Sequence, residues 1–178
     1  MIVDKNQRND RVATIPASPP NNLKKTDKEA LATSAFRNAE KFLNASRTIH
    51  IGMEPKCSWL PFVVNCAFAC ELYLKSLLSY NKIKFNLKKG HNLHYLFGLL
   101  PENIKDDLTA EAINLSPNEC LDKLLIGISD IFVSARYSHE KCLFSFNILG
   151  LEELTLLIRK KAYIEIRSLL EKTEMQNI

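Results

Sequence analysis

The sequence predicts an all-α protein, an up-and-down bundle of four main helices with short extra helices. Three observations point to this class. Apolar residues recur near the helical period over several long stretches. The chain holds only 5 Gly and 7 Pro in 178 residues, and no alternating apolar and polar run is long enough to indicate a strand. This length fits one domain, which we expect to span residues 27–175.

The chain begins with a polar, proline-containing stretch. Residues 1–26 include three prolines and asparagine-rich patches. Because such a composition buries little apolar surface, we expect a disordered N-terminal arm. Thr26 and Glu29 then form a capping box. The apolar residues that follow keep helical spacing and predict a first main helix over 27–50.

The second main helix is expected over 59–80 and is apolar almost all round. Such a helix belongs at the centre of a bundle or in an oligomer interface. It contains Asn65, Glu71 and Lys75, and its uninterrupted apolar run is shorter than the roughly 20 residues that cross a bilayer. We therefore expect a buried core helix and no membrane partner.

The second half of the chain predicts two short helices and two main helices. The short ones are expected over 93–100 and from Pro101 to about residue 113. A third main helix is expected from the capping box at 116–119 through Ala135, because its apolar residues keep helical spacing throughout. The last main helix, over 151–174, is amphipathic.

The net charge and the cysteines limit which functions and which cell compartment are expected. Residues 1–28 hold six Lys or Arg against three Asp, so the net charge of +4 leaves only +1 for the remaining 150 residues. This is too little for a surface that tracks nucleic-acid phosphates broadly, although it allows a local basic cleft. Five cysteines form no CxxC pair and no apolar signal segment is visible, so we expect a cytoplasmic, reduced protein.

No sequence feature calls for a metal or a cofactor. Cys66 and Cys70 share a helix face and could supply two ligands, but no matching His or Cys pair follows, so we expect core thiols. A glycine-rich phosphate loop and a nucleophile elbow are both lacking. Classical nucleotide hydrolysis and serine-hydrolase chemistry therefore have no support.

Two charged pairs interrupt strongly apolar helical stretches. Glu71 and Lys75 are four residues apart, and we expect a partly buried polar cluster in which Arg136 or a lysine neutralises Glu71. Arg136, His139 and Glu140 share one helix face. They form either an ordinary intrahelical ion pair with a polar neighbour, or a site in which Arg136 holds a phosphate and His139 acts in acid–base chemistry.

His91 stands before the first short helix, where free backbone amides and the helix dipole favour an anion. The alternative is that His91 and Asn92 only cap that helix.

Three segments resemble the HEPN family (higher eukaryotes and prokaryotes nucleotide-binding domains). Residues 65–78 contain the letters ELYLKSLL, residues 89–93 read KGHNL, and residues 132–140 contain Arg136, Tyr137 and Glu140. In this order they are similar to the ELYLKALL, GHDL and RYxxE segments of the stand-alone prokaryotic branch. The similarity spans about residues 30–170.

This resemblance implies a helical bundle that forms a homodimer with a cleft at the dimer interface. Many members are metal-independent endoribonucleases of toxin, antiphage or RNA-processing systems, in which a histidine follows an arginine four to six residues later. Arg136 takes the place of that arginine, but His139 follows it after only two intervening residues. Other branches are non-catalytic partners that bind RNA or a nucleotide.

Three functions are therefore open. The first is an HEPN-like domain that binds RNA or a nucleotide in the dimer cleft, non-catalytic or weakly active. The second is a metal-independent endoribonuclease of toxin or antiphage type, with Arg136 and His139 as catalytic residues. The third is a structural interaction module that neutralises a partner protein. The residues expected to contact the ligand are Glu71, Lys75, His91, Tyr137 and Glu140.

Overall fold

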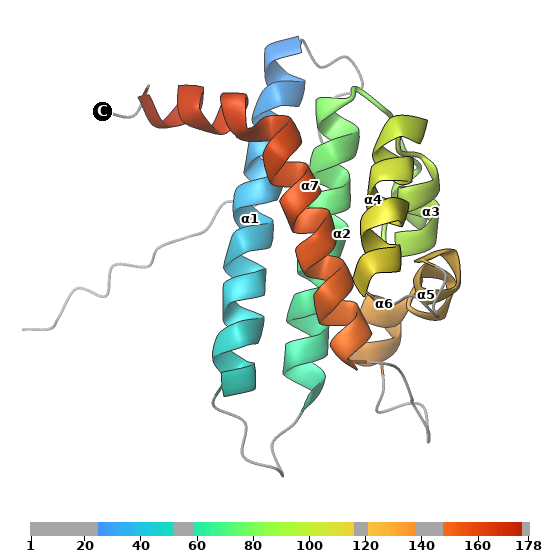
Figure 1. Cartoon of the computed structure of the whole chain (residues 1–178). Helices are drawn as coiled ribbons and strands as arrows, with labels where there is room; N and C mark the ends of the chain where they lie inside the picture. The colour runs from blue at the N-terminus through green and yellow to red at the C-terminus, as the bar shows by residue number, and fades with distance from the viewer. Residues whose placement is uncertain (1–24, 52–58, 116–120, 138–147, 176–178) are drawn as a thin grey trace, which may run out of the picture.

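The predicted all-α class is confirmed, because every regular element in the described residues is helical. This computed structural model describes residues 25–51, 59–115, 121–137 and 148–175. Almost all of the predicted N-terminal arm lies outside these ranges. Three long helices form the bundle: α1 (Lys25–Ile51), α2 (Trp59–Tyr80) and α7 (Ile148–Met175). Helices α1 and α2 run side by side in opposite directions, and α7 crosses them obliquely (Figure 1).

Helix α2 is the centre of the fold, as predicted. It packs against α1, α7, α6 and α3, and its buried residues include Phe62, Leu74 and Leu77. Of the helices in the described ranges, it is the one long and apolar enough to cross a membrane, and 67% of the apolar window is buried inside the fold. Because the core helix of a globular domain passes the same test, this is weak evidence for a membrane span.

The shorter elements lie along one side of the bundle (Figure 1). Helix α4 contacts α7, and Lys161 on α7 pairs with Asp107 on α4 at 2.6 Å. In chain order these elements are the 3₁₀ helix η1 (Leu87–Lys89), α3 (Leu93–Gly98), α4 (Glu102–Leu115), α5 (Leu121–Gly127) and α6 (Ile131–Arg136).

The prediction of one continuous third main helix is wrong, because a turn at 128–130 separates α5 from α6. The start of α3 holds this turn in place. The Leu93 amide donates to the Ser129 carbonyl at 2.8 Å, and Asn92 Nδ2 donates to the Asp130 carboxylate at 3.0 Å. These contacts join segments almost 40 residues apart, so they interrupt a helix whose apolar spacing continues across the break.

The first capping box does not mark a helix start as expected. Helix α1 already includes Thr26, because it begins at Lys25. The second capping box, at 116–119, lies outside the described residues. The last helix begins at Ile148, three residues before the predicted start.

Candidate functional site

A buried carboxylate organises the most polar part of the core. The Glu71 side chain, in the middle of α2, is fully buried. Its Oε1 accepts a hydrogen bond from Lys75 Nζ at 2.6 Å, and its Oε2 lies 3.0 Å from His91 Nδ1. Since a buried carboxylate is costly unless it is paired and hydrogen-bonded, these two contacts account for its place in the core. We call Glu71, Lys75 and His91 the Glu71 cluster.

The imidazole of His91 is fixed in two directions. Its Nδ1 edge faces Glu71, and its ring stacks on Phe132 of α6, with centroids 5.5 Å apart and planes at 26°. Phe132 in turn stacks on Phe68 of α2 at 5.0 Å. The His91 side chain nevertheless keeps 49% of its surface exposed. The fold therefore presents an oriented imidazole at the surface.

Lys75 lies beneath the turn that carries His91. Its Nζ is 5.6 Å from the centroid of the Phe85 ring, which adds a cation–π contact. Gly90 closes this turn: a Cβ there would lie 3.1 Å from the Leu87 carbonyl oxygen and 3.6 Å from Lys75 Nζ. A glycine therefore avoids a tight contact with the Leu87 carbonyl, whereas the contact with Lys75 would be an ordinary one.

Helix α6 connects this cluster to Arg136. Phe132 and Arg136 are one helical turn apart, and Arg136 is the last residue of α6. The structure describes the backbone of Arg136 but not its side chain, and Tyr137 follows with 44% of its surface exposed. His139 and Glu140 lie outside the described residues. The ligand and catalytic roles of all these residues stay predictions.

The geometry distinguishes between the alternatives for Glu71 and for the start of α3. Glu71 pairs with a lysine, as one alternative had it, and also with His91. At α3, Asn92 is the N-cap, and its side chain accepts from the Tyr95 amide at 2.7 Å. The capping interpretation is therefore confirmed for Asn92. His91 faces Glu71 instead.

A second polar network, which was not predicted from the sequence, joins three helices. Glu40 of α1 accepts hydrogen bonds from Arg159 Nε at 2.6 Å and Nη2 at 3.0 Å on α7. The buried Tyr73 hydroxyl of α2 donates to the same carboxylate at 2.7 Å. The sequence feature that could have indicated this network is Tyr73 on the apolar helix α2, because a buried tyrosine hydroxyl usually has a hydrogen-bond partner. All three side chains are mutually satisfied, so we assign this network to the fold.

We expect Glu40→Gln to destabilise the fold by about 1–2 kcal/mol at neutral pH. Burial raises the pKa of Glu40, but hydrogen bonds from Arg159 and Tyr73 and the Arg159 charge hold that pKa below its usual value. A carboxyl with a lowered folded pKa stabilises the fold above its unfolded pKa, and this contribution disappears as the pH falls through the folded pKa. In denaturant unfolding, the difference in stability between Glu40→Gln and the parent protein should therefore be larger at pH 7 than at pH 3.

The exposed Glu153 of α7 gives the control for that experiment. Glu153→Gln should leave the free energy of unfolding nearly unchanged at both pH values. An equal loss for Glu40→Gln at pH 7 and pH 3 would show that lost packing, not lost charge, causes the effect.

The two described cysteines belong to the core, as the sequence predicted. Cys66 Sγ lies 3.4 Å from Thr155 Oγ1 of α7. Burial raises the pKa of the Cys66 thiol to about 11 and also raises that of Cys70. Thiols of this kind are unreactive. No group of three potential metal ligands occurs in the part of the chain that the structure describes.

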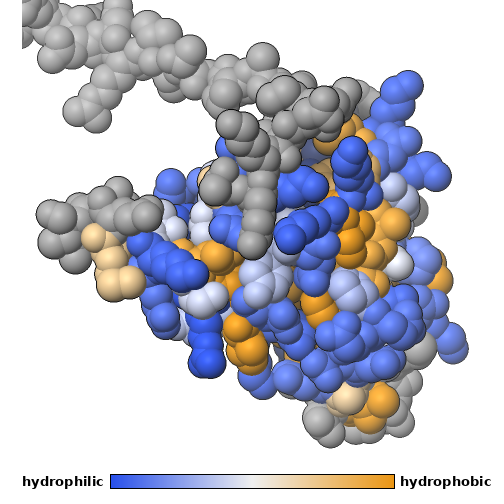
Figure 2. Space-filling model, turned by 90° about the horizontal axis from the view of Figure 1, so that it is seen from above, coloured by the Kyte–Doolittle hydropathy of each residue, from blue (hydrophilic) through white to orange (hydrophobic). Residues whose placement is uncertain are grey.

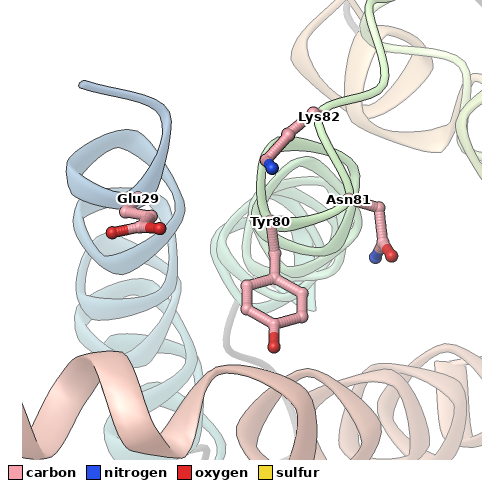
Figure 3. A pocket seen from close by; sticks show the side chains of 4 residues that line it. All are labelled: Glu29, Tyr80, Asn81 and Lys82. Carbon is pink, nitrogen blue, oxygen red and sulfur yellow. The ribbon is translucent and has the colours of Figure 1, made fainter. Parts of the chain in front are cut away.

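A separate pocket of about 420 Å³ opens at the end of α2 (Figure 3). Glu29 of α1 lines one side, and Tyr80, Asn81 and Lys82 line the other, with Tyr80 pointing towards α7. None of the predicted site residues whose side chains the structure describes lines it. Figure 2 shows this end of the molecule, where hydrophilic residues dominate and hydrophobic groups lie between them. This composition is ordinary for a protein surface.

Comparisons with known proteins support the resemblance seen in the sequence. The family model described as HEPN domain matches residues 32–168, which is most of the chain. Comparison with curated proteins found no significant match, and neither did comparison with solved structures.

Proposed function

The chain belongs to the HEPN domain family, and from this premise we propose that it binds RNA or a nucleotide beside the Glu71 cluster, in a site that a second copy of the chain completes. The observation that supports this most is the half-exposed imidazole of His91, which the buried Glu71 carboxylate orients. The imidazole stacks on Phe132, and Phe132 lies one helical turn before Arg136 on α6. Phosphates are bound by cationic and hydrogen-bonding groups held in this way.

The low net charge of the domain favours a ligand that only a few protein groups contact. Because residues 29–178 carry a net charge of only +1, binding depends on a few oriented groups and not on a broad positive surface. Lys75 and His91 supply two such groups, since both contact one carboxylate. Arg136 would supply the third, as the group that contacts a phosphate.

An apolar strip on α6 supports the homodimer. Val133 and Tyr137 are one turn apart and expose 37% and 44% of their surfaces, and Ile126 of the adjoining α5 is also exposed. A second copy packed against this strip would bury apolar surface next to Arg136. This arrangement would place the ligand site at the interface.

Cleavage of RNA is the second candidate function. The observation that favours it is the same oriented imidazole, because histidine is the side chain most often used for proton transfer near neutral pH. The short spacing from Arg136 to His139 departs from the usual motif, so we place binding first.

Binding of a labelled single-stranded RNA and of labelled ATP, measured by fluorescence anisotropy, tests the proposal. We expect Arg136→Ala to weaken binding about tenfold, because it removes a charge-assisted hydrogen bond to phosphate. Arg167→Ala, at an exposed position of α7, should bind like the parent protein. A folded parent protein that binds neither probe, or one that is monomeric at micromolar concentration, would contradict the proposal.

A further inference from the structure

We propose that the pocket at the end of α2 binds a free α-amino acid. Its volume of about 420 Å³ lies near the lower end of the roughly 300–1,000 Å³ that is typical of small-molecule sites. The described residues that line it are Glu29, Tyr80, Asn81 and Lys82. None of them belongs to the site proposed for RNA or a nucleotide, so the two sites can be tested separately.

Two opposite charges face this pocket without neutralising each other. Glu29 approaches from α1, and Lys82 extends from the end of α2 on the side that faces Glu29 (Figure 3). Within the part of the chain that the structure describes, neither side chain forms an ion pair or a hydrogen bond. An ammonium and a carboxylate that are separated in this way can bind a molecule that carries both charges.

Lysines elsewhere on the surface differ from Lys82 in this respect. Lys105 of α4 and Lys160 and Lys161 of α7 each lie within 2.9 Å of a carboxylate oxygen of the same chain. Their charges are therefore already paired within the fold. The ammonium of Lys82 remains available to a ligand.

The backbone of Lys82 is the second support. Among the described residues, Lys82 is the one non-glycine residue with a positive φ, 59°. It ends α2 in a left-handed conformation, in which its amide donates to the Ser79 carbonyl at 3.0 Å and the Ile83 amide donates to the Leu78 carbonyl at 2.8 Å. Glycine is preferred there because a Cβ strains this conformation. Strain of this kind is retained mostly at functional sites, and here the strained residue lines a pocket.

The lining provides a partner for each end of an amino acid. Lys82 would donate to the ligand carboxylate, and Glu29 would accept from the ligand ammonium. Tyr80 is partly buried, and its ring offers apolar surface to the ligand side chain. We assign Asn81 to the helix end instead, because its Nδ2 donates to the Leu77 carbonyl at 2.8 Å.

Protein NMR titration of the full chain with each common L-amino acid tests the proposal. We expect at least one of them to shift the amide signals of residues 80–82, with a Kd of about 1 mM, because the pocket is open to solvent. The N-acetylated form of that amino acid lacks the ammonium, and its amide form lacks the carboxylate. Each form should bind about tenfold more weakly, since one charge-assisted hydrogen bond is lost.

Two variants show whether each charge contacts the expected end of the ligand. In Glu29→Gln, acetylation of the ligand should no longer weaken binding, and in Lys82→Gly the amide form should bind like the free acid. Lys82→Gly should also raise the melting temperature by about 2–4 °C, because glycine relieves the backbone strain. Its lost binding therefore cannot come from unfolding.

Lys84→Gly is the matched control. Lys84 is also exposed, stands two residues later and has no positive φ. The variant should bind the amino acid like the parent and gain no stability.

Each outcome decides the proposal without affecting RNA binding, which is tested at Arg136. Loss of discrimination at the matching end of the ligand in both variants would support it. A folded parent protein in which no amino acid shifts the amides of residues 80–82 would overturn it. Capped forms that bind as tightly as the free amino acid would also overturn it, as would equal losses of binding in Lys82→Gly and Lys84→Gly.

Discussion

Lys75→Met should destabilise the fold by about 3 kcal/mol, the cost expected when a buried charge loses its partner. Methionine keeps most of the aliphatic stem of the lysine but removes the ammonium 2.6 Å from Glu71 Oε1. The carboxylate has no exposed surface, so water cannot replace the lost partner, and only His91 remains. Denaturant unfolding at pH 7, where carboxylates are ionised, measures the loss.

The chain contains a closely matched control for this prediction. Lys105 also bonds a glutamate at 2.6 Å and is 24% exposed, against 22% for Lys75, but its partner Glu102 is 77% exposed. Lys105→Met should therefore cost less than about 0.5 kcal/mol. Adding Glu71→Gln to Lys75→Met should recover much of the loss, because the buried charge is then gone. Equal effects for the two lysine variants would refute the burial argument.

The sequence predicted the long helices well, because their evidence is local. The predicted range 59–80 is the observed range of α2, and the bounds 27–50 differ from α1 by one or two residues. The break between α5 and α6 could not be predicted in the same way. Apolar residues keep helical spacing on both sides of Ser129, and the contacts that hold the turn come from the start of α3.

The candidate site shows the same difference between local sequence evidence and long-range contacts. Glu71, Lys75 and His91 were each predicted from their neighbours in sequence. That His91 bonds to Glu71 was not predicted, because this contact spans 20 residues and depends on the path of the turn through Gly90. The stack of His91 on Phe132 likewise arises only when α6 packs against α2. Sequence patterns identified the groups, and tertiary packing decides their partners.

Phe132→Ala is expected to cost about 3 kcal/mol of stability, which is typical for truncating a buried phenylalanine. Phe132 is nearly buried between the rings of Phe68 and His91. Helix α6 has only six residues, and its N-cap Asp130 makes no side-chain capping bond. A helix this short is not stable without tertiary packing. Hydrogen exchange should therefore show the largest loss of protection at the α6 amides that bond within the helix.

Val133→Ala, at an exposed neighbour on the same helix, should cost less than about 1 kcal/mol and leave α6 protected. Phe132→Leu separates packing from stacking, since leucine keeps apolar volume but offers no ring to His91. It should cost less stability than Phe132→Ala and still weaken RNA binding, because the imidazole loses one of its two constraints. If Phe132→Leu binds RNA like the parent, the stack does not position His91, and Glu71 alone must orient the imidazole.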